Sequence, residues 1–215
     1  MKKTTVMLVD DHAVVRAGYR LLLSQAGDLE VTGEAERGEE ACQRYFEITP
    51  DVAIIDLSLP GLGGLAVIRR ICTREPSARL LACSIHDEPV YVSRTLEAGA
   101  KGYITKSSPP ELLVEAVRRI ANGGRFVEPA LAQRLAASHP TSTKTNGLDS
   151  LSAREFDVFC LLARGLTPRE TAEQLHMGYK TACNYSTAIK AKLGINTTAE
   201  MARLAMQLGI VQEAP

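Results

Sequence analysis

Short apolar runs alternate with amphipathic stretches along the first 125 residues of the chain. The runs are rich in β-branched and aliphatic residues and nearly unbroken, which is typical of strands buried on both faces. They are Thr5–Val9, a weaker run around Glu30–Ala35, Val52–Leu57, Leu80–Ser84 and Gly102–Thr105. Between them, apolar residues recur at helical spacing. These repeats predict a doubly wound α/β domain over residues 1–125, with helices on both faces of a parallel five-stranded sheet.

Two of the predicted helices carry clear local signals. Residues Val14–Ala26 place an apolar stripe, from Val14 to Leu22, at helical spacing, so we expect this face to be buried. Residues Glu111–Ala121 follow Ser108-Pro109-Pro110, a pattern that predicts a capping box with proline in the first turn.

The chain changes character after residue 125. A short helical pattern covers Ala130–Ala137, and the polar, turn-rich residues Ser138–Ser150 follow it. We interpret residues 126–148 as a linker that contains a short helix. Residues 149–215 look helical throughout and predict a small all-α domain of four helices. Capping-box patterns open three of them, at residues 152–155, 167–170 and 197–200.

Composition and charge exclude several classes of protein. Hydrophobic residues make up 45% and charged residues 23%, which is ordinary globular usage, and 25 basic residues balance 25 acidic ones. A polybasic protein is therefore excluded, although a local basic patch is not. The five cysteines form no CxxC pair, which argues against zinc and disulfide scaffolds and favours a reducing, cytoplasmic location. Because no apolar run approaches the length of a membrane span, we expect no membrane partner.

Charged and polar side chains follow the strands at one edge of the predicted sheet. Asp10 and Asp11 end the first strand and Asp56 the third, while Ser84 and Lys106 end the fourth and fifth. Ligands bind at the carboxyl ends of strands in doubly wound sheets. Neighbouring carboxylates repel one another unless a cation neutralises them, and a hard divalent ion, Mg²⁺, is the expected cofactor. With that ion in place, one carboxylate could attack a phosphoryl group.

The sequence resembles the two-component response regulators of the NarL/FixJ type, which join a flavodoxin-like receiver domain to a LuxR-type helix–turn–helix domain. The resemblance covers essentially the whole chain apart from the linker. Its motifs are LVDDH (Leu8–His12), IIDLSLPGLGG (Ile54–Gly64), Ser84, GYITK (Gly102–Lys106), LSAREFDVFCLLARGLTPRETAEQL (Leu151–Leu175), KTACNY and KLGI. Tyr185, the sequence RFVEPALAQ and a Gly-Ile-Val end are similar to the GacA/UvrY group within that family.

The resemblance implies a role for each residue at the sheet edge. Asp56 would be the phosphoacceptor. The Mg²⁺ ligands would be Asp10, Asp11, Asp56 and the backbone carbonyl of Ser58. Each carboxylate alone could instead be a helix cap or a loop residue, and His12 beside them is more typical of a helix start than of a metal ligand.

The resemblance also implies a switch. Lys106 would pair with the phosphoryl group, Ser84 would move to meet it, and Tyr103 would turn inward behind Ser84. The plainer alternatives are a solvated lysine, a helix-capping serine and a core aromatic. Lys106 is followed by Ser107, where the family often has a proline in a cis bond.

The helical region fits a helix–turn–helix. Thr167–His176 would be the scaffold helix, with Ala172 and Leu175 inward, and Lys180–Lys192 the recognition helix. By resemblance, three residues would face bases: Cys183, Asn184 and Thr187. Four more would flank phosphates: Lys180, Thr181, Tyr185 and Lys190. For the lysines, a solvated helix face remains an alternative.

This helix departs from the family pattern at two positions. Cys183 and Ser186 stand where a lysine and an arginine are usual, so two positive charges would be missing from the groove side. Each lost phosphate contact weakens binding and lowers its salt dependence, whereas Asn184 could still read adenine.

Together these features predict a regulator and not an enzyme. A sensor histidine kinase would phosphorylate Asp56, and phosphorylation would favour a homodimer that binds promoter DNA at a two-fold site. The last helix, Glu200–Leu208, would supply the dimer surface or simply core. The alternative is a phosphorylation-gated protein-interaction module whose DNA binding is weakened or lost. A haloacid-dehalogenase-type phosphatase would need an acid two residues after the nucleophile, where this chain has Ser58.

Overall fold

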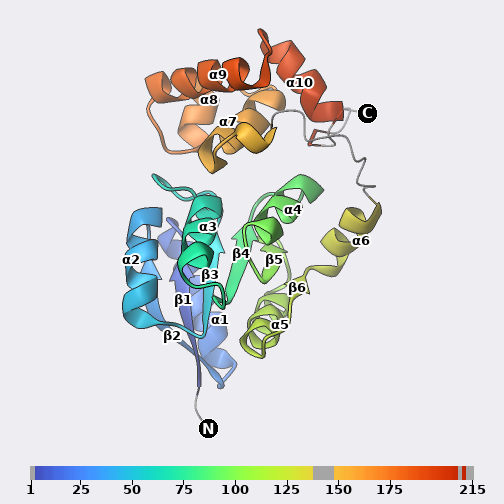
Figure 1. The fold of residues 1–215 in the computed structure, drawn as a ribbon. Coiled ribbons are helices and arrows are strands. Elements are labelled where there is room, and N and C mark those ends of the chain that lie inside the picture. The colour runs from blue at the N-terminus through green and yellow to red at the C-terminus, as the bar shows by residue number, and fades with distance from the viewer. Residues whose placement is uncertain (1–2, 138–147, 208–209, 212–215) are drawn as a thin grey trace. The chain divides into compact units, whose positions relative to one another are not determined.

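The computed structural model describes residues 3–137, 148–207 and 210–211. The chain divides into two compact units: the first comprises residues 1–87 and 91–137, and the second residues 88–90 and 138–215. Figure 1 shows strands only in the first unit and helices in both. The predicted α/β domain followed by an all-α domain is therefore confirmed.

The first unit is built on a fully parallel sheet in the order β2-β1-β3-β4-β5-β6. Its strands are β1 (Thr4–Val9), β2 (Leu29–Ala35), β3 (Val52–Asp56), β4 (Leu80–Ser84), β5 (Gly102–Thr105) and β6 (Phe126–Val127). The helices between and after them are α1 (Ala13–Gln25), α2 (Gly38–Ile48), α3 (Gly64–Arg74), α4 (Pro89–Glu97), α5 (Pro110–Ala121) and α6 (Pro129–Ala137).

The central strands are buried on both faces, as their unbroken apolar sequences predict. Every residue of β3, β4 and β5 is buried. Alternate residues such as Leu8 and Ile54 pack into one core cluster with Leu23 of α1 and Val117 of α5. Helices α2 and α3 pack against each other on the sheet. Both faces are thus covered, and the carboxyl ends of the strands are left free to carry polar residues.

The buried face of α1 differs from the predicted stripe. Val14 and Leu21 are 85% and 61% exposed, whereas Arg16 and Leu23 are buried. Arg16 is drawn inward because its guanidinium has polar partners there: the Asp10 carbonyl and the Glu34 and Glu36 carboxylates. Hydrophobic spacing located this helix correctly but assigned its inner face incorrectly.

The predicted capping box at Ser108 is absent. Helix α5 begins after Pro109, and no side chain caps it. The Ser108 hydroxyl instead bonds to Thr105 and Glu128. The sequence pattern located the start of the helix correctly, but the Ser108 hydroxyl binds a residue distant in the sequence instead of capping the helix.

The sheet has one strand more than predicted. Phe126 and Val127 form β6, which pairs in parallel with Gly102 and Tyr103 of β5. The extra strand satisfies the backbone groups of an otherwise open sheet edge and buries Phe126. The predicted short helix follows directly as α6.

The second unit is helical in its described residues. A short 3₁₀ turn, η1 (Leu148–Ser150), precedes four α-helices: α7 (Ala153–Ala163), α8 (Pro168–Gln174), α9 (Tyr179–Leu193) and α10 (Thr198–Gln207). The first two predicted capping boxes are complete. In the third, the Thr197 hydroxyl accepts from the backbone N–H of Glu200 at 3.1 Å, and the Glu200 carboxylate accepts from the backbone N–H of Asn196 at 2.8 Å. Among the helices that the structure describes, none combines the length and apolar character that crossing a bilayer requires.

Candidate functional site

Three carboxylates converge at the carboxyl ends of β1 and β3. The side chains of Asp10, Asp11 and Asp56, together with His12, each place a potential ligand atom within 4.8 Å of the others. Asp10 and Asp56 are buried, at 4% and 1% exposure. Parallel β1 and β3 lie side by side in the sheet, which is why residues so far apart in sequence meet. Three hard oxygen donors this close form a fitting site for a divalent cation such as Mg²⁺.

Lys106 closes the cluster from the end of β5. Its Nζ lies 2.7 Å from Asp10 Oδ2 and 2.8 Å from Asp56 Oδ2, so one ammonium group bridges two buried carboxylates. The backbone N–H of Lys106 donates to the Ser84 carbonyl at 2.7 Å, which fixes the turn from which the side chain reaches.

The electrostatics of this bridge follow from burial and from the carboxylates. Burial alone would lower the pKa of Lys106, but Asp56 and Asp10 outweigh it and raise that pKa, so the ammonium stays charged. Burial raises the pKa of Asp56, and Lys106 opposes the rise. The arrangement therefore holds a cation beside a carboxylate that has few competing contacts with water.

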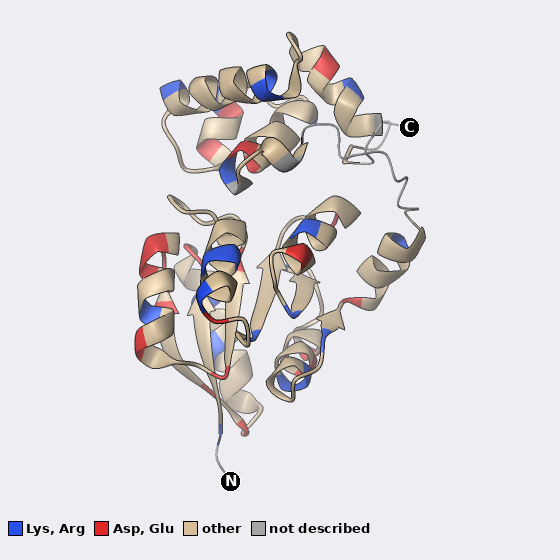
Figure 2. Cartoon of the chain, viewed as in Figure 1, with Lys and Arg blue, Asp and Glu red and all other residues tan. Residues whose placement is uncertain are grey.

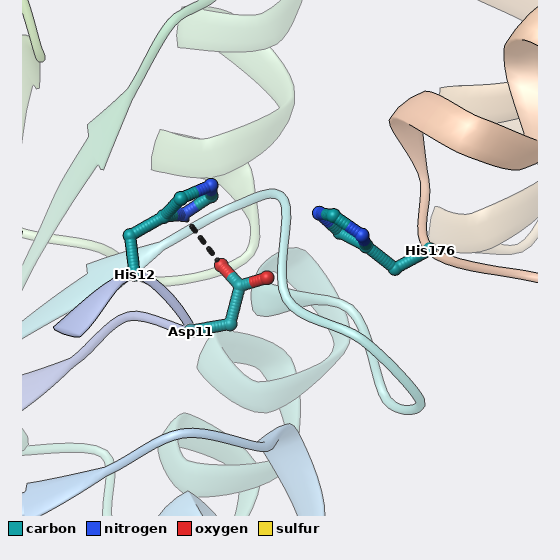
Figure 3. Close-up of side chains that lie close together, drawn as sticks. All are labelled: Asp11, His12 and His176. Carbon is teal, nitrogen blue, oxygen red and sulfur yellow. Dashed lines mark ion pairs between the residues drawn. The ribbon is translucent and has the colours of Figure 1, made fainter.

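His12 marks the start of α1, as expected, and also touches the acids. It is the N-cap residue of α1, and its backbone N–H donates to Asp10 Oδ1 at 2.8 Å. Its ring Nδ1 lies 2.9 Å from Asp11 Oδ1, the ion pair drawn in Figure 3. The His12 side chain is 54% exposed and the Asp11 side chain 15%. Asp11 thus sits between the buried carboxylates and the surface.

The segment after Asp56 is held close to the strand. The backbone N–H of Ser58 donates to Asp56 Oδ1 at 3.0 Å, which orients the carboxylate. Gly64 begins α3 so near the strand that a Cβ there would lie 1.9 Å from the Asp56 carbonyl oxygen. Only glycine fits this approach without displacing the end of β3.

Ser84 and Tyr103 are both fully buried and are linked through His86. The Ser84 hydroxyl accepts from the backbone N–H of His86 at 3.2 Å, and the Tyr103 hydroxyl donates to the His86 carbonyl at 2.7 Å. The His86 ring stacks on Tyr91 with centroids 4.1 Å apart. Tyr103 is therefore inward, and the loop between β4 and α4 is bound to both residues.

Sequence reasoning missed Arg16, which supports the site from behind. Its Nη1 donates to the backbone carbonyl of Asp10 at 2.6 Å, and its Nε lies 3.2 Å from Glu34 Oε2. Arg16 thereby fixes the backbone that carries the first carboxylate. The signal that could have identified it is an arginine four residues after His12, among the apolar residues that begin the predicted helix.

On α9, most of the predicted contact residues are accessible. Lys180, Thr181, Asn184 and Thr187 are exposed, and Cys183, Tyr185 and Lys190 are half-buried. The Thr187 hydroxyl donates to the Cys183 carbonyl at 3.1 Å, so it is partly engaged by its own helix. Ala172 and Leu175 are buried, as the helix–turn–helix interpretation requires.

Two details of α9 correct the expected charge pattern. Ser186 is buried on the same face as Ala182 and Ile189, because positions 182, 186 and 189 share one side of a helix, so an arginine there would not simply face outward. Lys192 Nζ lies 2.6 Å from Glu155 Oε2, so its charge is paired with a carboxylate of α7. Figure 2 shows basic residues only towards the two ends of α9 and no acidic residue along it.

The expected dimer surface is only partly described. Leu204 is half-buried on α10, and Leu208 lies outside the described residues.

A parallel α/β unit with an acidic pocket, joined to a helix–turn–helix unit, defines a two-domain regulatory protein. Residues 6–118 match the response regulator receiver domain, and residues 149–205 match the bacterial regulatory proteins of the luxR family. The chain therefore belongs to the response regulators that combine a receiver with a LuxR-type DNA-binding domain, a family of transcription regulators and not of enzymes.

Relatives match over the full length of the chain. It is similar to the transcriptional activator protein ExaE of Pseudomonas putida, at 39% identity over 97% of this chain and 99% of ExaE. It is similar to the response regulator UvrY of Escherichia coli K12, at 34% identity over 95% of this chain and 94% of UvrY. A solved structure of two RcsB dimers bound to two parallel DNAs has 25% identity, a TM-score of 0.60, and covers 96% of this chain and 100% of that one.

Proposed function

We propose that Asp56 is the phosphoacceptor of a two-component system and that its phosphorylation controls dimerisation and promoter binding. The observation that carries the proposal is the bridge from Lys106 to Asp56 and Asp10. In this bridge the Asp56 carboxylate lies beside an ammonium group, at the edge where a doubly wound sheet binds ligands, which supports a role as acceptor. We assign the receiver to residues 1–125, the linker to 126–148 and the DNA-binding domain to 149–215.

The phosphoryl donor in this proposal is a phosphohistidine of a sensor kinase, and the transfer takes place in the cytoplasm. An Asp56 carboxylate oxygen forms a bond to phosphorus while the bond from phosphorus to the histidine nitrogen breaks, and the electron pair stays on that nitrogen. Lys106 then pairs with the new phosphoryl oxygens, and the Ser84 hydroxyl donates to one of them. Tyr103 stays behind Ser84 as its support.

Mg²⁺ would be held by the carboxylates of Asp10, Asp11 and Asp56 and the backbone carbonyl of Ser58. The carboxylates fit because their oxygens already lie together, two of them buried. When bound, the ion neutralises negative charge on the transferring phosphoryl group.

DNA recognition is assigned to α9. Asn184 and Thr187, with Cys183 beside them, would face base edges, and the phosphate contacts would come from Lys180, Thr181, Tyr185 and Lys190. The accessible polar side chains of the first half of α9 support this assignment. The DNA-bound dimers of the RcsB relative support a two-fold arrangement on DNA.

A second function is favoured by one observation. With Lys192 paired to Glu155 and cysteine at 183, α9 presents few free charges to a phosphate backbone. A protein-interaction module gated by phosphorylation is therefore the alternative.

The test incubates the full chain with Mg²⁺ and acetyl phosphate, beside an Asp56→Asn variant. A phosphate-affinity gel reports phosphorylation, and retention of genomic fragments reports DNA binding. A shifted band that Asp56→Asn lacks, with stronger DNA retention, supports the proposal. A shifted band without retention at low salt favours the interaction module, and no shifted band rejects Asp56 as the acceptor.

A further inference from the structure

The turn that carries Lys106 is fixed by hydroxyl groups. Thr105 Oγ1 lies 3.0 Å from Ser107 Oγ and 2.9 Å from Ser108 Oγ, and the backbone N–H of Thr105 donates to Ser108 Oγ at 3.1 Å. These residues flank Lys106 on both sides. The position of its ammonium group therefore depends on what holds the hydroxyls in place.

Glu128 holds them. Its Oε2 accepts from Ser108 Oγ at 2.6 Å, from Thr105 Oγ1 at 3.2 Å and from the backbone N–H of Thr105 at 3.2 Å. Its own N–H donates to the Tyr103 carbonyl at 3.1 Å. Glu128 lies between β6 and α6, in the segment of residues 126–137 that we call the β6–α6 arm.

The arm has a second attachment, on the loop after β4. Nη1 of Arg134, on α6, lies 2.6 Å from Asp87 Oδ2, and both side chains are partly exposed. Asp87 follows His86, the residue that binds both Ser84 and Tyr103. An exposed ion pair of this kind is weak. A movement of the loop that carries Asp87 can therefore break it at little cost in free energy.

We infer that the β6–α6 arm, which is the first part of the linker, carries the output of the receiver. In this inference Glu128 is a positioning residue for Lys106, and the Arg134–Asp87 pair is a latch that phosphorylation opens. The inference rests on the proposed function of Asp56. The two loops that would rearrange around a phosphoryl group, at Ser84 and at Lys106, are the two loops to which the arm is attached. One event at Asp56 thus acts on both attachments of the arm.

The arm is well placed to pass the change on. It ends at Ala137, the last residue of the first unit along the chain, and the next residue already belongs to the second unit. Coupling of this kind is reciprocal, so opening the latch by mutation must also favour the phosphorylated state.

The decisive experiment measures hydrogen exchange in the full chain with Mg²⁺, before and after addition of acetyl phosphate. A phosphate-affinity gel on the same sample reports the extent of phosphorylation. Peptides from residues 126–137 should exchange about tenfold faster once Asp56 is phosphorylated, while α2 peptides should not change. If the gel shows phosphorylation and exchange in the arm stays unchanged, the inference is wrong and the proposed function stands. If no phosphorylated band forms, both are rejected.

Variants separate the two attachments. Arg134→Ala should speed exchange in the arm without phosphorylation, whereas the control Arg125→Ala, one residue before the arm, should not. Arg125 makes no ion pair within the described part of the chain. Equal effects of the two variants would contradict a specific latch.

For Glu128 the readout is the phosphorylation rate. Glu128→Ala should slow it about tenfold, because Lys106 loses its fixed position, with Mg²⁺ affinity by calorimetry unchanged. Glu128→Gln should recover most of the rate, because an amide oxygen still accepts from the same hydroxyls. Failure of Glu128→Gln to recover the rate, or an equal loss of Mg²⁺ affinity, would overturn the positioning role.

Discussion

Lys192 Nζ lies 2.6 Å from the Glu155 carboxylate, so the last lysine of α9 binds the first turn of α7. The same nitrogen donates to the Ser150 carbonyl at 3.2 Å. Glu155 also completes the capping box with Ser152. One carboxylate therefore caps α7 and ties it to α9, the helix to which DNA contacts are assigned.

This carboxylate should make the second unit sensitive to acid. Burial would raise the pKa of Glu155, but its bonds to Lys192 and Ser152 hold that pKa below its usual value. A lowered folded-state pKa stabilises the fold above the unfolded value, near pH 4.3, and the stabilisation disappears as pH falls through the folded value. Glu155→Gln should lower the free energy of unfolding by about 1–2 kcal/mol at pH 7 and by much less at low pH.

Cys160 offers a local readout of this prediction, because it is fully buried on α7. Its labelling rate in urea is followed by mass spectrometry of the α7 peptide. The ratio of the variant's rate to that of the unsubstituted chain at the same pH reports the change in unfolding of the second unit, because the pH dependence of the thiolate cancels in that ratio. If Glu155→Gln lowers the free energy of unfolding by the same amount at pH 7 and at low pH, the ion-pair explanation is contradicted.

The lysines of α9 should differ in how they affect DNA binding. Lys180 is exposed at the start of α9, and its replacement by alanine should weaken binding and lower the slope of log affinity against log salt by about 0.9. Lys192→Ala should leave the slope unchanged, because its charge is already paired. Fluorescence anisotropy on one promoter fragment at several salt concentrations measures both slopes. A slope that falls equally in the two variants would mean that Lys192 leaves Glu155 to bind phosphate.

Periodicity and strand ends gave most of the architecture. All five apolar runs became strands, and the helix–turn–helix was located correctly, because both depend on local patterns of burial. Asp10, Asp11, Asp56 and Lys106 also came together at the sheet edge, since parallel strands bring their carboxyl ends to one side, whereas the Ser84 hydroxyl binds the backbone of His86. What these residues do chemically stays a prediction until phosphorylation is measured.

The errors share a physical cause, which is polar partners distant in the sequence. Arg16 is buried because β2 supplies carboxylates, and Ser108 leaves its helix because Glu128 accepts from its hydroxyl. Neither partner is visible in a local window. The sixth strand was missed because two residues are too few to show a period.

Arg16 and Arg20 offer a matched pair for testing the support behind Asp10. Both lie on α1 and pair with Glu34, but the Arg16 side chain is 9% exposed and that of Arg20 is 60% exposed. Arg16→Ala should lower the free energy of unfolding by about 2–4 kcal/mol, because it leaves the buried Asp10 carbonyl without its donor and removes the partner of the largely covered Glu34 carboxylate. Arg20→Ala should cost less than about 1 kcal/mol. Urea unfolding followed by circular dichroism measures the free energy of unfolding of both variants. Similar losses in the two would show that the burial of Arg16 adds nothing to the stability of the fold.

Mg²⁺ should stabilise the first unit through the acidic pocket. A ligand that binds only the folded state raises the free energy of unfolding by about 2.7 kcal/mol at a hundred times its dissociation constant. Asp11→Asn removes a carboxylate from the cluster and should abolish most of this gain. Asp28→Asn is the control, since Asp28 is an exposed acid that pairs with Arg118 outside the cluster. The measurement is the urea midpoint of each variant with and without Mg²⁺. If Asp11→Asn keeps the full gain, the ion binds elsewhere; if Asp28→Asn also loses it, the effect is general screening of charge.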